Sequence, residues 1–253
     1  DATSVERETE DFTAHLGDDI TGMKIALPTD MLETQGLDPE IKASIYEAAE
    51  KLAAAGAEIG EISLPHAKYG LSAYYVVGPA EASSNLARFD GIRYGHRVED
   101  AEDVLDLYMR SRAEGFGPET IRRIMIGTYA LSAGYYDAYY GKAQKVRTVI
   151  KQDFDDAFKD FDIILTPTTP TTSFKFGSKT TDPYAMYLSD VFTVPVNLAG
   201  NVGLSIPVGC AKADNMPIGL QLIGDHFQEQ KVFHVAHALE DIYKFHSVPA
   251  NLK

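Results

Sequence analysis

Cysteine is nearly absent from this sequence, since Cys210 is the only one among 253 residues. A single cysteine excludes an internal disulfide framework and a zinc site built from several cysteines, and it favours a reducing compartment. No apolar run approaches the roughly 18–20 residues that cross a bilayer, so no membrane partner is expected. The opening residues, DATSVERETEDF, are acidic and contain no apolar core, so we expect no secretory signal there.

Positive charge is also scarce. Lys and Arg number 23 against 37 Asp and Glu, which gives a formal net charge of −14. This balance argues against a chain that itself neutralises a nucleic-acid backbone, although such a chain can work beside another protein that does. The hydrophobic share of 45% and the charged share of 24% are ordinary for a globular protein, so long disorder is not expected.

The common catalytic signatures are missing too. The sequence contains no P-loop, GxGxxG, GxSxG, SxxK or HExxH pattern, which leaves nucleotide-binding, α/β-hydrolase, β-lactamase and zinc-protease classes unsupported. The nearest metal-like feature is His234 with His237, and His226 upstream. No third ligand or carboxylate is spaced to join them, so we expect polar residues beside an apolar stripe and no metal. Cys210 has no nearby histidine in sequence, so a structural role is favoured over a nucleophile.

Apolar periodicity predicts an α/β chain with a helix-rich middle. Predicted strands lie at 23–28, 57–65, 162–167, 197–209 and 216–224. Predicted helices run from Pro39 to just before Gly56 and over 71–89, 101–114, 118–133, 135–158 and 228–244. The Gly78-Pro79 pair is expected to kink or split its helix. The first strand, helix and second strand form a β-α-β unit, which brings two strands into one sheet.

A run of tyrosines opens the predicted helix 135–158. Tyr135, Tyr136, Tyr139 and Tyr140 stand at positions i, i+1, i+4 and i+5. Such a run is typical of core or helix–helix packing, with the hydroxyls reaching polar partners. A stacking platform for nucleic acid is the alternative. The net negative charge favours packing.

Four longer runs are too particular for a generic α/β domain. They cover residues 73–97, 114–148, 182–200 and 216–224. Together they resemble the amidase signature family, and within it the A subunits of tRNA-dependent amidotransferases, which help to convert glutamyl-tRNA(Gln) into glutaminyl-tRNA(Gln). The run PAEASSNL followed by RFDGIRYG separates these subunits from other amidases. The resemblance implies a mixed sheet covered by helices and present here only in part. Residues 1–253 form the C-terminal portion of one amidase-signature domain, and we assign no internal boundary to them.

The resemblance also implies a mechanism. The family uses a Ser–Ser–Lys constellation: one serine attacks the side-chain amide of glutamine, ammonia leaves, and water hydrolyses the acyl-enzyme. The lysine acts as a base only where burial depresses its pKa and keeps it neutral. These residues lie on a Gly/Ser-rich loop and before it, and this sequence contains no such loop. Ser83 and Ser84, in EASSNL, lack the required glycines, so we expect no catalytic residue in this chain and no amide hydrolysis by it alone.

Recognition of glutamine is the role that the resemblance leaves to this chain. Arg123, in IRRIMIG, is expected to hold the α-carboxylate, and Asp190, in YLSDVFT, the α-ammonium. Tyr74, in AYYVVG, is expected to form a pocket wall and to offer its hydroxyl. From the residues alone, ordinary alternatives stay open: a surface arginine like Arg122, a helix-end carboxylate, and a core tyrosine.

Further expectations follow from the resemblance. It implies no cofactor in this chain, ATP and Mg²⁺ in a partner B subunit, contacts with B and C subunits, tRNA reached through the B subunit, and a cytoplasmic location. One departure stands out: Asn201 and Val202 occupy places where the family usually has Leu-Pro after NLAG. The pocket on that side is therefore expected to differ.

Two other interpretations remain open. The chain is alternatively a fragment of a stand-alone amidase-signature hydrolase, or a non-catalytic interaction module. A partial sheet would leave strand edges and apolar surface exposed, so self-association is expected.

Overall fold

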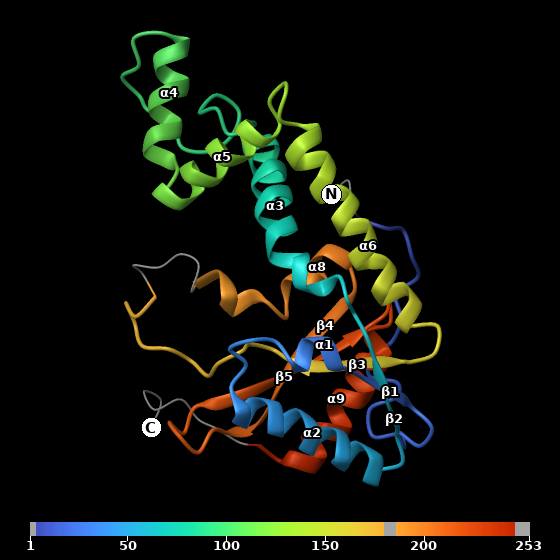
Figure 1. Cartoon of the computed structure of the whole chain (residues 1–253). Helices are drawn as coiled ribbons and strands as arrows, with labels where there is room; N and C mark the ends of the chain where they lie inside the picture. The colour runs from blue at the N-terminus through green and yellow to red at the C-terminus, as the bar shows by residue number, and fades with distance from the viewer. Residues whose placement is uncertain (1–3, 180–185, 246–253) are drawn as a thin grey trace. The chain divides into compact units, whose positions relative to one another are not determined.

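The computed structural model describes residues 4–179 and 186–245 (Figure 1). The chain divides into two compact units, Asp1–Leu71 with Val149–Lys253, and Ser72–Thr148. We call them the sheet unit and the helical unit. The helices α3 (Gly70–Leu86) and α6 (Lys142–Ala157) carry residues of both. Among the described residues, no helix is long and apolar enough to cross a bilayer.

A five-stranded mixed sheet forms the centre of the sheet unit. Its strands, in spatial order, are β2 (Glu58–Ile62), β1 (Lys24–Pro28), β3 (Ile163–Pro167), β5 (Pro217–Gly224) and β4 (Val202–Cys210). β1 runs parallel to both β2 and β3, whereas β5 runs antiparallel to both β3 and β4. The predicted mixed sheet is therefore confirmed.

The β1–α2–β2 unit shows how the sequence sets this architecture. Asp38 caps α2 (Pro39–Ala54), since its side chain accepts a hydrogen bond from the Glu40 amide at 2.7 Å, and Pro39 fits the first turn. The helix buries Ile41, Ile45, Ala48, Ala49 and Leu52, as their spacing predicts. Gly56 follows with φ +101, a conformation that favours glycine and allows the chain to turn into β2.

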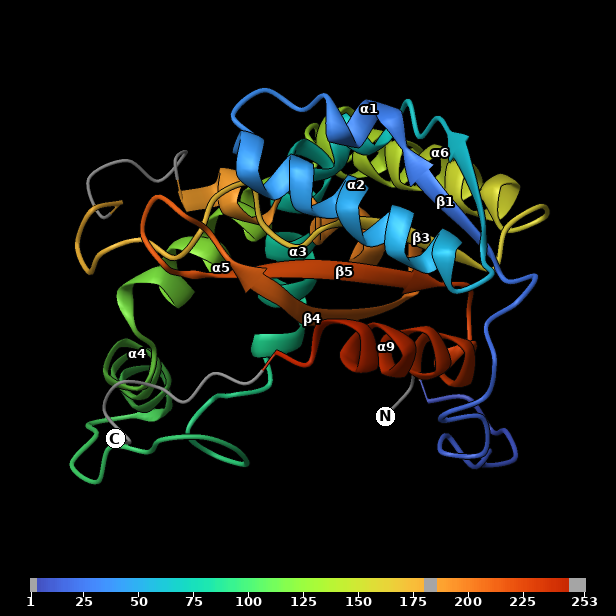
Figure 2. The ribbon, with the colours of Figure 1, turned by 90° about the horizontal axis from the view of Figure 1, so that it is seen from below.

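The core of the sheet unit lies between the sheet and two helices. α2 and α9 (Glu229–Tyr243) cover one face of the sheet (Figure 1), and the same layer faces the viewer in Figure 2. Their buried side chains pack with Ile25, Ile163, Leu220 and Leu222, each of them fully buried or nearly so. Burial at this level contributes about 1.5–3 kcal/mol for each large aliphatic side chain, so this layer is the main source of stability in the unit.

The sheet unit also contains short helical elements that connect its strands and longer helices. They are α1 (Thr29–Leu32), η1 (Ala67–Tyr69), η3 (Leu188–Asp190) and α8 (Val194–Ala199). The predicted strand at 197–209 is wrong in its first residues, because α8 continues to Ala199 and Gly200 ends it with φ +84. β4 begins only at Val202.

The helical unit contains α4 (Val104–Gly115), α5 (Pro118–Ala130) and the single-turn π-helix η2 (Asp137–Gly141). Of the two alternatives expected at Gly78-Pro79, a kink or a split, the split is wrong, since α3 continues through Pro79. The predicted helix 135–158 begins as η2 and continues as α6. α3 and α5 touch backbone to backbone: a Cβ on Gly127 would lie 1.9 Å from the Pro79 carbonyl oxygen.

Much of the apolar surface in the helical unit is exposed. On α4, Leu107 is buried, but Val104, Leu105 and Met109 are exposed by 60% or more of their surface. The tyrosines near η2 are also partly exposed, and their rings pack on one another. Tyr129 and Tyr135 lie 4.4 Å apart between ring centroids, and Tyr136 and Tyr140 lie 5.2 Å apart. The predicted packing role is therefore confirmed for the rings, but not burial.

Candidate functional site

The structure brings two of the three expected glutamine ligands together. Arg123 lies in the second turn of α5, and Tyr74 lies in the first half of α3. The Arg123 Nη1 donates a hydrogen bond to the Tyr74 hydroxyl, with 3.4 Å between the two atoms. The two residues are 49 positions apart, so this contact depends on how α3 and α5 pack.

Glu119 completes this corner, although it was not among the residues predicted from the sequence. Its carboxylate accepts hydrogen bonds from Arg123 Nε at 2.8 Å and from Arg122 Nη2 at 2.7 Å. These bonds, first that of Arg122 and then that of Arg123, lower the pKa of Glu119 to about 2. The same contact with Glu119, followed by that with Tyr74, raises the pKa of Arg123. The spacing of three and four residues along a helix was the available signal.

This corner is suited to an anionic group. Two guanidinium groups share the carboxylate of Glu119, so the three side chains together carry one net positive charge. Glu119 occupies the Nε side of Arg123, and no residue in the described part of the chain accepts a hydrogen bond from Nη2. The edge formed by Nη1 and Nη2 therefore offers the paired donors that a carboxylate accepts in parallel.

The Tyr74 ring has close neighbours on α3, Tyr75 and Gly78. Its ring is half-buried and meets the ring of Tyr75 edge to face, at 5.1 Å between centroids and 82° between planes. Gly78 lies one turn further along α3, and a Cβ there would come within 3.2 Å of the Tyr74 ring. The absence of a side chain at this position leaves the ring room to lie along the helix.

Asp190 is placed in the sheet unit, at the end of η3, and its side chain is exposed. Phe192, two residues later, is fully buried and anchors this segment. Because Arg123 and Tyr74 belong to the helical unit, a meeting of all three residues around one ligand stays a prediction.

A buried polar contact fixes the segment after Asp190, and it too was not predicted from the sequence. The Gln221 Nε2 donates to Thr166 Oγ1 at 2.9 Å and to the Phe192 carbonyl at 3.1 Å. Gln221 is 5% exposed and Thr166 is fully buried. A lone glutamine inside the apolar strand GLQLIG was the signal, because a buried amide needs partners.

The comparisons with known proteins agree on one family. The sequence matches the Amidase family over residues 1–233. The chain belongs to the amidase family. It is 54% identical over 252 residues to the A subunit of the glutamyl-tRNA(Gln) amidotransferase of Bacillus pumilus, a match that covers all of this chain and 51% of that protein. The corresponding A subunit from Lacticaseibacillus casei is 54% identical over 240 residues, covering 95% of this chain and 49% of that protein.

Solved structures support the amidase fold. The crystal structure of the glutamyl-tRNA(Gln) amidotransferase A subunit from Thermotoga maritima aligns with a TM-score of 0.74 at 39% identity, covering 98% of this chain and 48% of that one. A bacterial aryl acylamidase of the amidase signature family aligns with a TM-score of 0.69 at 21% identity, covering 93% of this chain and 46% of that one, which shows the fold alone. This amidase-family chain spans about half the length of the curated relatives it matches.

The serines of this amidase-family chain match their expected surroundings. Ser83 and Ser84 both lie within α3, as the helical context predicts. The Ser83 hydroxyl is buried and donates to the Ala80 carbonyl at 2.8 Å. This hydrogen bond lies within α3. The Ser83 Oγ also lies near the crossing with α5, since a Cβ on Gly127 would be 2.8 Å from it.

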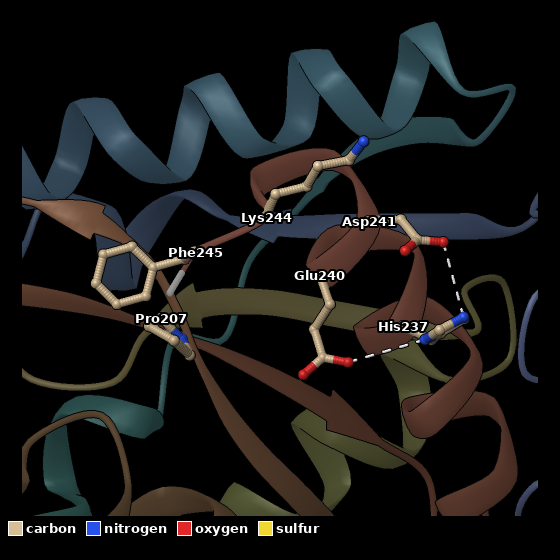
Figure 3. Close-up of a pocket in the computed structure, with 6 residues that line it drawn as sticks. All are labelled: Pro207, His237, Glu240, Asp241, Lys244 and Phe245. Carbon is tan, nitrogen blue, oxygen red and sulfur yellow. Dashed lines mark ion pairs between the residues drawn. The ribbon is translucent and has the colours of Figure 1, made fainter. Parts of the chain in front are cut away.

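A cavity on the amidase sheet unit has other surroundings. It has a volume of about 440 Å³ and lies between the last turns of α9 and β4 (Figure 3). His237 lies 3.8 Å from Glu240 and 3.7 Å from Asp241. Within residues 4–179 and 186–245, no group of three His, Cys, Asp or Glu residues could hold a metal ion. None of the expected glutamine ligands lines this cavity.

The other histidines and the cysteine have separate positions. His234 Nε2 lies 3.0 Å from the Asp18 carbonyl, which ties α9 to the N-terminal segment. His226 Nε2 is buried without a partner among the described residues. Cys210 ends β4 and is exposed.

Proposed function

We propose that this chain is the C-terminal half of the A subunit of a tRNA-dependent amidotransferase, where it holds the glutamine whose amide supplies ammonia. The contact between Arg123 and Tyr74 carries the proposal, because it builds a carboxylate-binding edge from two residues far apart in sequence. The relatives from Bacillus pumilus and Lacticaseibacillus casei, both described as A subunits of glutamyl-tRNA(Gln) amidotransferase, support the assignment of the reaction.

Each end of the glutamine meets a different part of the chain in this proposal. Arg123 binds the α-carboxylate through Nη1 and Nη2, with Glu119 holding the guanidinium from its Nε side. The Tyr74 hydroxyl accepts from Arg123 and borders the same ligand oxygen. Asp190 binds the α-ammonium from the sheet unit. The side-chain amide is then directed toward the serine nucleophile, which belongs to the other half of the protein.

The remaining parts of the reaction lie with partners. In this proposal the Ser–Ser–Lys residues come from the other half of the same protein, and a B subunit uses ATP and Mg²⁺ to activate the glutamyl-tRNA. A C subunit completes the cytoplasmic complex. The tRNA binds to the B subunit, not to this chain, in keeping with the net charge of −14.

Substitution of Arg123 tests the proposal in a full-length protein that carries this sequence, assembled with its B and C subunits. Arg123→Ala should lower kcat/KM for glutamine about 10–100-fold, because a charge-assisted bidentate contact is lost. Synthesis of Gln-tRNA from free ammonium should be unchanged, since that reaction bypasses the glutamine pocket.

Arg122→Ala is the matched control. Arg122 lies on the same helix and also pairs with Glu119, but it does not contact Tyr74 in any described contact. It should lower kcat/KM for glutamine less than Arg123→Ala does, because it removes a positive charge from the corner but none of the donors on the edge formed by Nη1 and Nη2 of Arg123. Equal losses in both variants, or unchanged use of glutamine after Arg123→Ala, would contradict the assignment.

A further inference from the structure

The segment that carries Asp190 is held by a buried side chain of the sheet. Gln221 lies on β5 directly opposite Thr166 of β3, in the register that pairs these two antiparallel strands. Its Nε2 donates to Thr166 Oγ1 at 2.9 Å and to the Phe192 carbonyl at 3.1 Å. Both donor hydrogens of the amide therefore have acceptors.

The position of Gln221 on β5 decides which way it reaches. Leu220 and Leu222, its neighbours on the strand, face the core formed with α2 and α9. Side chains alternate along a strand, so Gln221 points to the opposite face. Gly203 of β4 lies beside it there, since a Cβ on Gly203 would be 3.8 Å from Gln221 Oε1 and 3.4 Å from Val196 of α8. The segment at 190–199 thus packs on the face that Gln221 reaches.

The turn from Asp190 to Thr193 links the Phe192 carbonyl, which Gln221 holds, to Asp190. The Thr193 amide donates to the Asp190 carbonyl at 3.1 Å, and the Thr193 hydroxyl donates to the same oxygen at 3.2 Å. The Phe192 side chain, inside this turn, is fully buried. A fixed Phe192 carbonyl therefore fixes the whole turn, and with it the direction in which the exposed Asp190 carboxylate leaves the backbone.

We propose that Gln221, supported by Thr166, is a positioning residue for glutamine recognition: it holds the 190–193 turn so that Asp190 meets the α-ammonium group. This inference rests on the proposed function above. Gln221 itself does not touch the ligand. Its amide sets the place of a carboxylate 31 positions earlier in the chain, through a hydrogen bond to the Phe192 carbonyl 29 positions earlier.

The test compares two substrates that differ only in the α-ammonium group. The full-length protein carrying this sequence, assembled with its partners, hydrolyses L-glutamine or glutaramate, which has the same amide and carboxylate but no amino group. The ratio of the two kcat/KM values measures how well Asp190 engages the ammonium. A variant that is merely less folded loses both activities equally, so the ratio does not move.

Gln221→Met keeps the length of the side chain and removes both hydrogen bonds. We expect it to lower the glutamine preference about 5–10-fold, and Asp190→Asn to lower it about 10–100-fold, because a charge-assisted contact is lost. The double variant should lose no more preference than Asp190→Asn alone, since both changes act through one carboxylate. Thr166→Val should lower the preference for glutamine less than Gln221→Met does. Thr166→Ser retains the hydroxyl, so it should keep the preference of the unsubstituted protein.

Gln152→Met is the matched control, because Gln152 is on α6 and bonds only to the exposed Asp156 in the described contacts. It should leave the ratio unchanged. If Asp190→Asn lowers the preference but Gln221→Met does not, the positioning role is overturned while the proposed function stands. If the unsubstituted protein shows no preference for glutamine, or Asp190→Asn leaves it unchanged, both proposals are overturned.

Discussion

The two units of this chain use apolar residues in different ways. In the sheet unit, buried aliphatic side chains from the two ends of the chain pack in one core. Ile45 of α2 and Leu222 of β5, both fully buried, belong to it. In the helical unit, the backbones of α3 and α5 approach closely at Gly127, and large apolar side chains on α4 and α5 are exposed. Helical periodicity therefore predicts burial only where another element covers the apolar face.

This contrast extends to the proposed site. The helical unit supplies Arg123 and Tyr74, which depend on the close approach of α3 and α5. The sheet unit supplies Asp190, whose segment is fixed by a buried amide on the sheet. Substitutions in the two units should therefore have different costs, and the following predictions rank them.

Leu222→Ala should have the largest effect on stability. Leu222 is fully buried in the core with α2 and α9, so its truncation should cost about 2–5 kcal/mol. Met125→Ala, on α5, should change stability by less than about 0.5 kcal/mol, because 68% of Met125 is exposed. Urea denaturation followed by circular dichroism measures both. Similar costs for the two variants would remove the contrast between the units.

Gly127→Ala should come next, with a cost of about 1–3 kcal/mol from the added methyl group. The new Cβ would overlap the Pro79 carbonyl, so α3 and α5 must move apart. Hydrogen exchange should show faster exchange on these two helices and unchanged protection on β3 and β5. Gly141→Ala is the control, since its Cβ would lie 3.6 Å from the Tyr136 carbonyl oxygen, an ordinary contact distance. Normal protection of α3 and α5 in the Gly127 variant would show that the crossing is not close.

Asn201→Leu should stabilise the chain by about 1–3 kcal/mol. Both polar atoms of the Asn201 side chain are buried, and neither has a partner in the described part of the chain. The resemblance to the amidase signature family places leucine here. Thermal denaturation should show a higher midpoint. Asn215→Leu is the opposite case, because φ +57 at this residue disfavours leucine, and it should lower the midpoint. A lower midpoint for Asn201→Leu would indicate that the amide is satisfied.

The pH dependence of the Glu119 corner should be the smallest effect. The pKa of Glu119 is lowered to about 2 by Arg122 and Arg123, below its usual value of 4.5. A depressed carboxyl pKa stabilises the folded state above the unfolded pKa, and this contribution is lost as the pH falls from about 4.5 to about 2. Because the side chain is half exposed, solvent screening limits it to less than about 1 kcal/mol.

A carbon-detected titration of the Glu119 carboxylate by NMR measures this pKa directly. Replacing both Arg122 and Arg123 by alanine should raise it toward 4.5. An unchanged pKa in the double variant would mean that the two arginines do not hold this carboxylate.

Part of the fold was predictable from local pattern. The β1–α2–β2 unit followed from apolar spacing, a capping Asp38 and a glycine with positive φ. The start of β4 was not, because NLAG is apolar in pattern and yet ends α8. Nor was the exposure of α4, since periodicity cannot say what covers a face.

The candidate site divides in the same way. Arg123, Tyr74 and Asp190 were found through resemblance; the structure shows the first two in contact, and the binding of glutamine by all three stays a prediction. The pairing of Glu119 with Arg122 and Arg123 could have been predicted from their spacing of three and four residues on a helix. The partners of Gln221 were not, because Thr166 is 55 positions away and Phe192 is reached through its backbone.

The sequence by itself determined most of the secondary structure, the negative charge and the membership of a family. Each of these depends on composition, on local pattern or on runs of residues that match those of relatives. Tertiary structure alone decided that β3 lies between β1 and β5, and that an arginine on one helix meets a tyrosine on another. The physical reason is that such contacts form only when segments far apart in the chain are packed together. Their energy depends on burial and geometry that no local window of sequence contains.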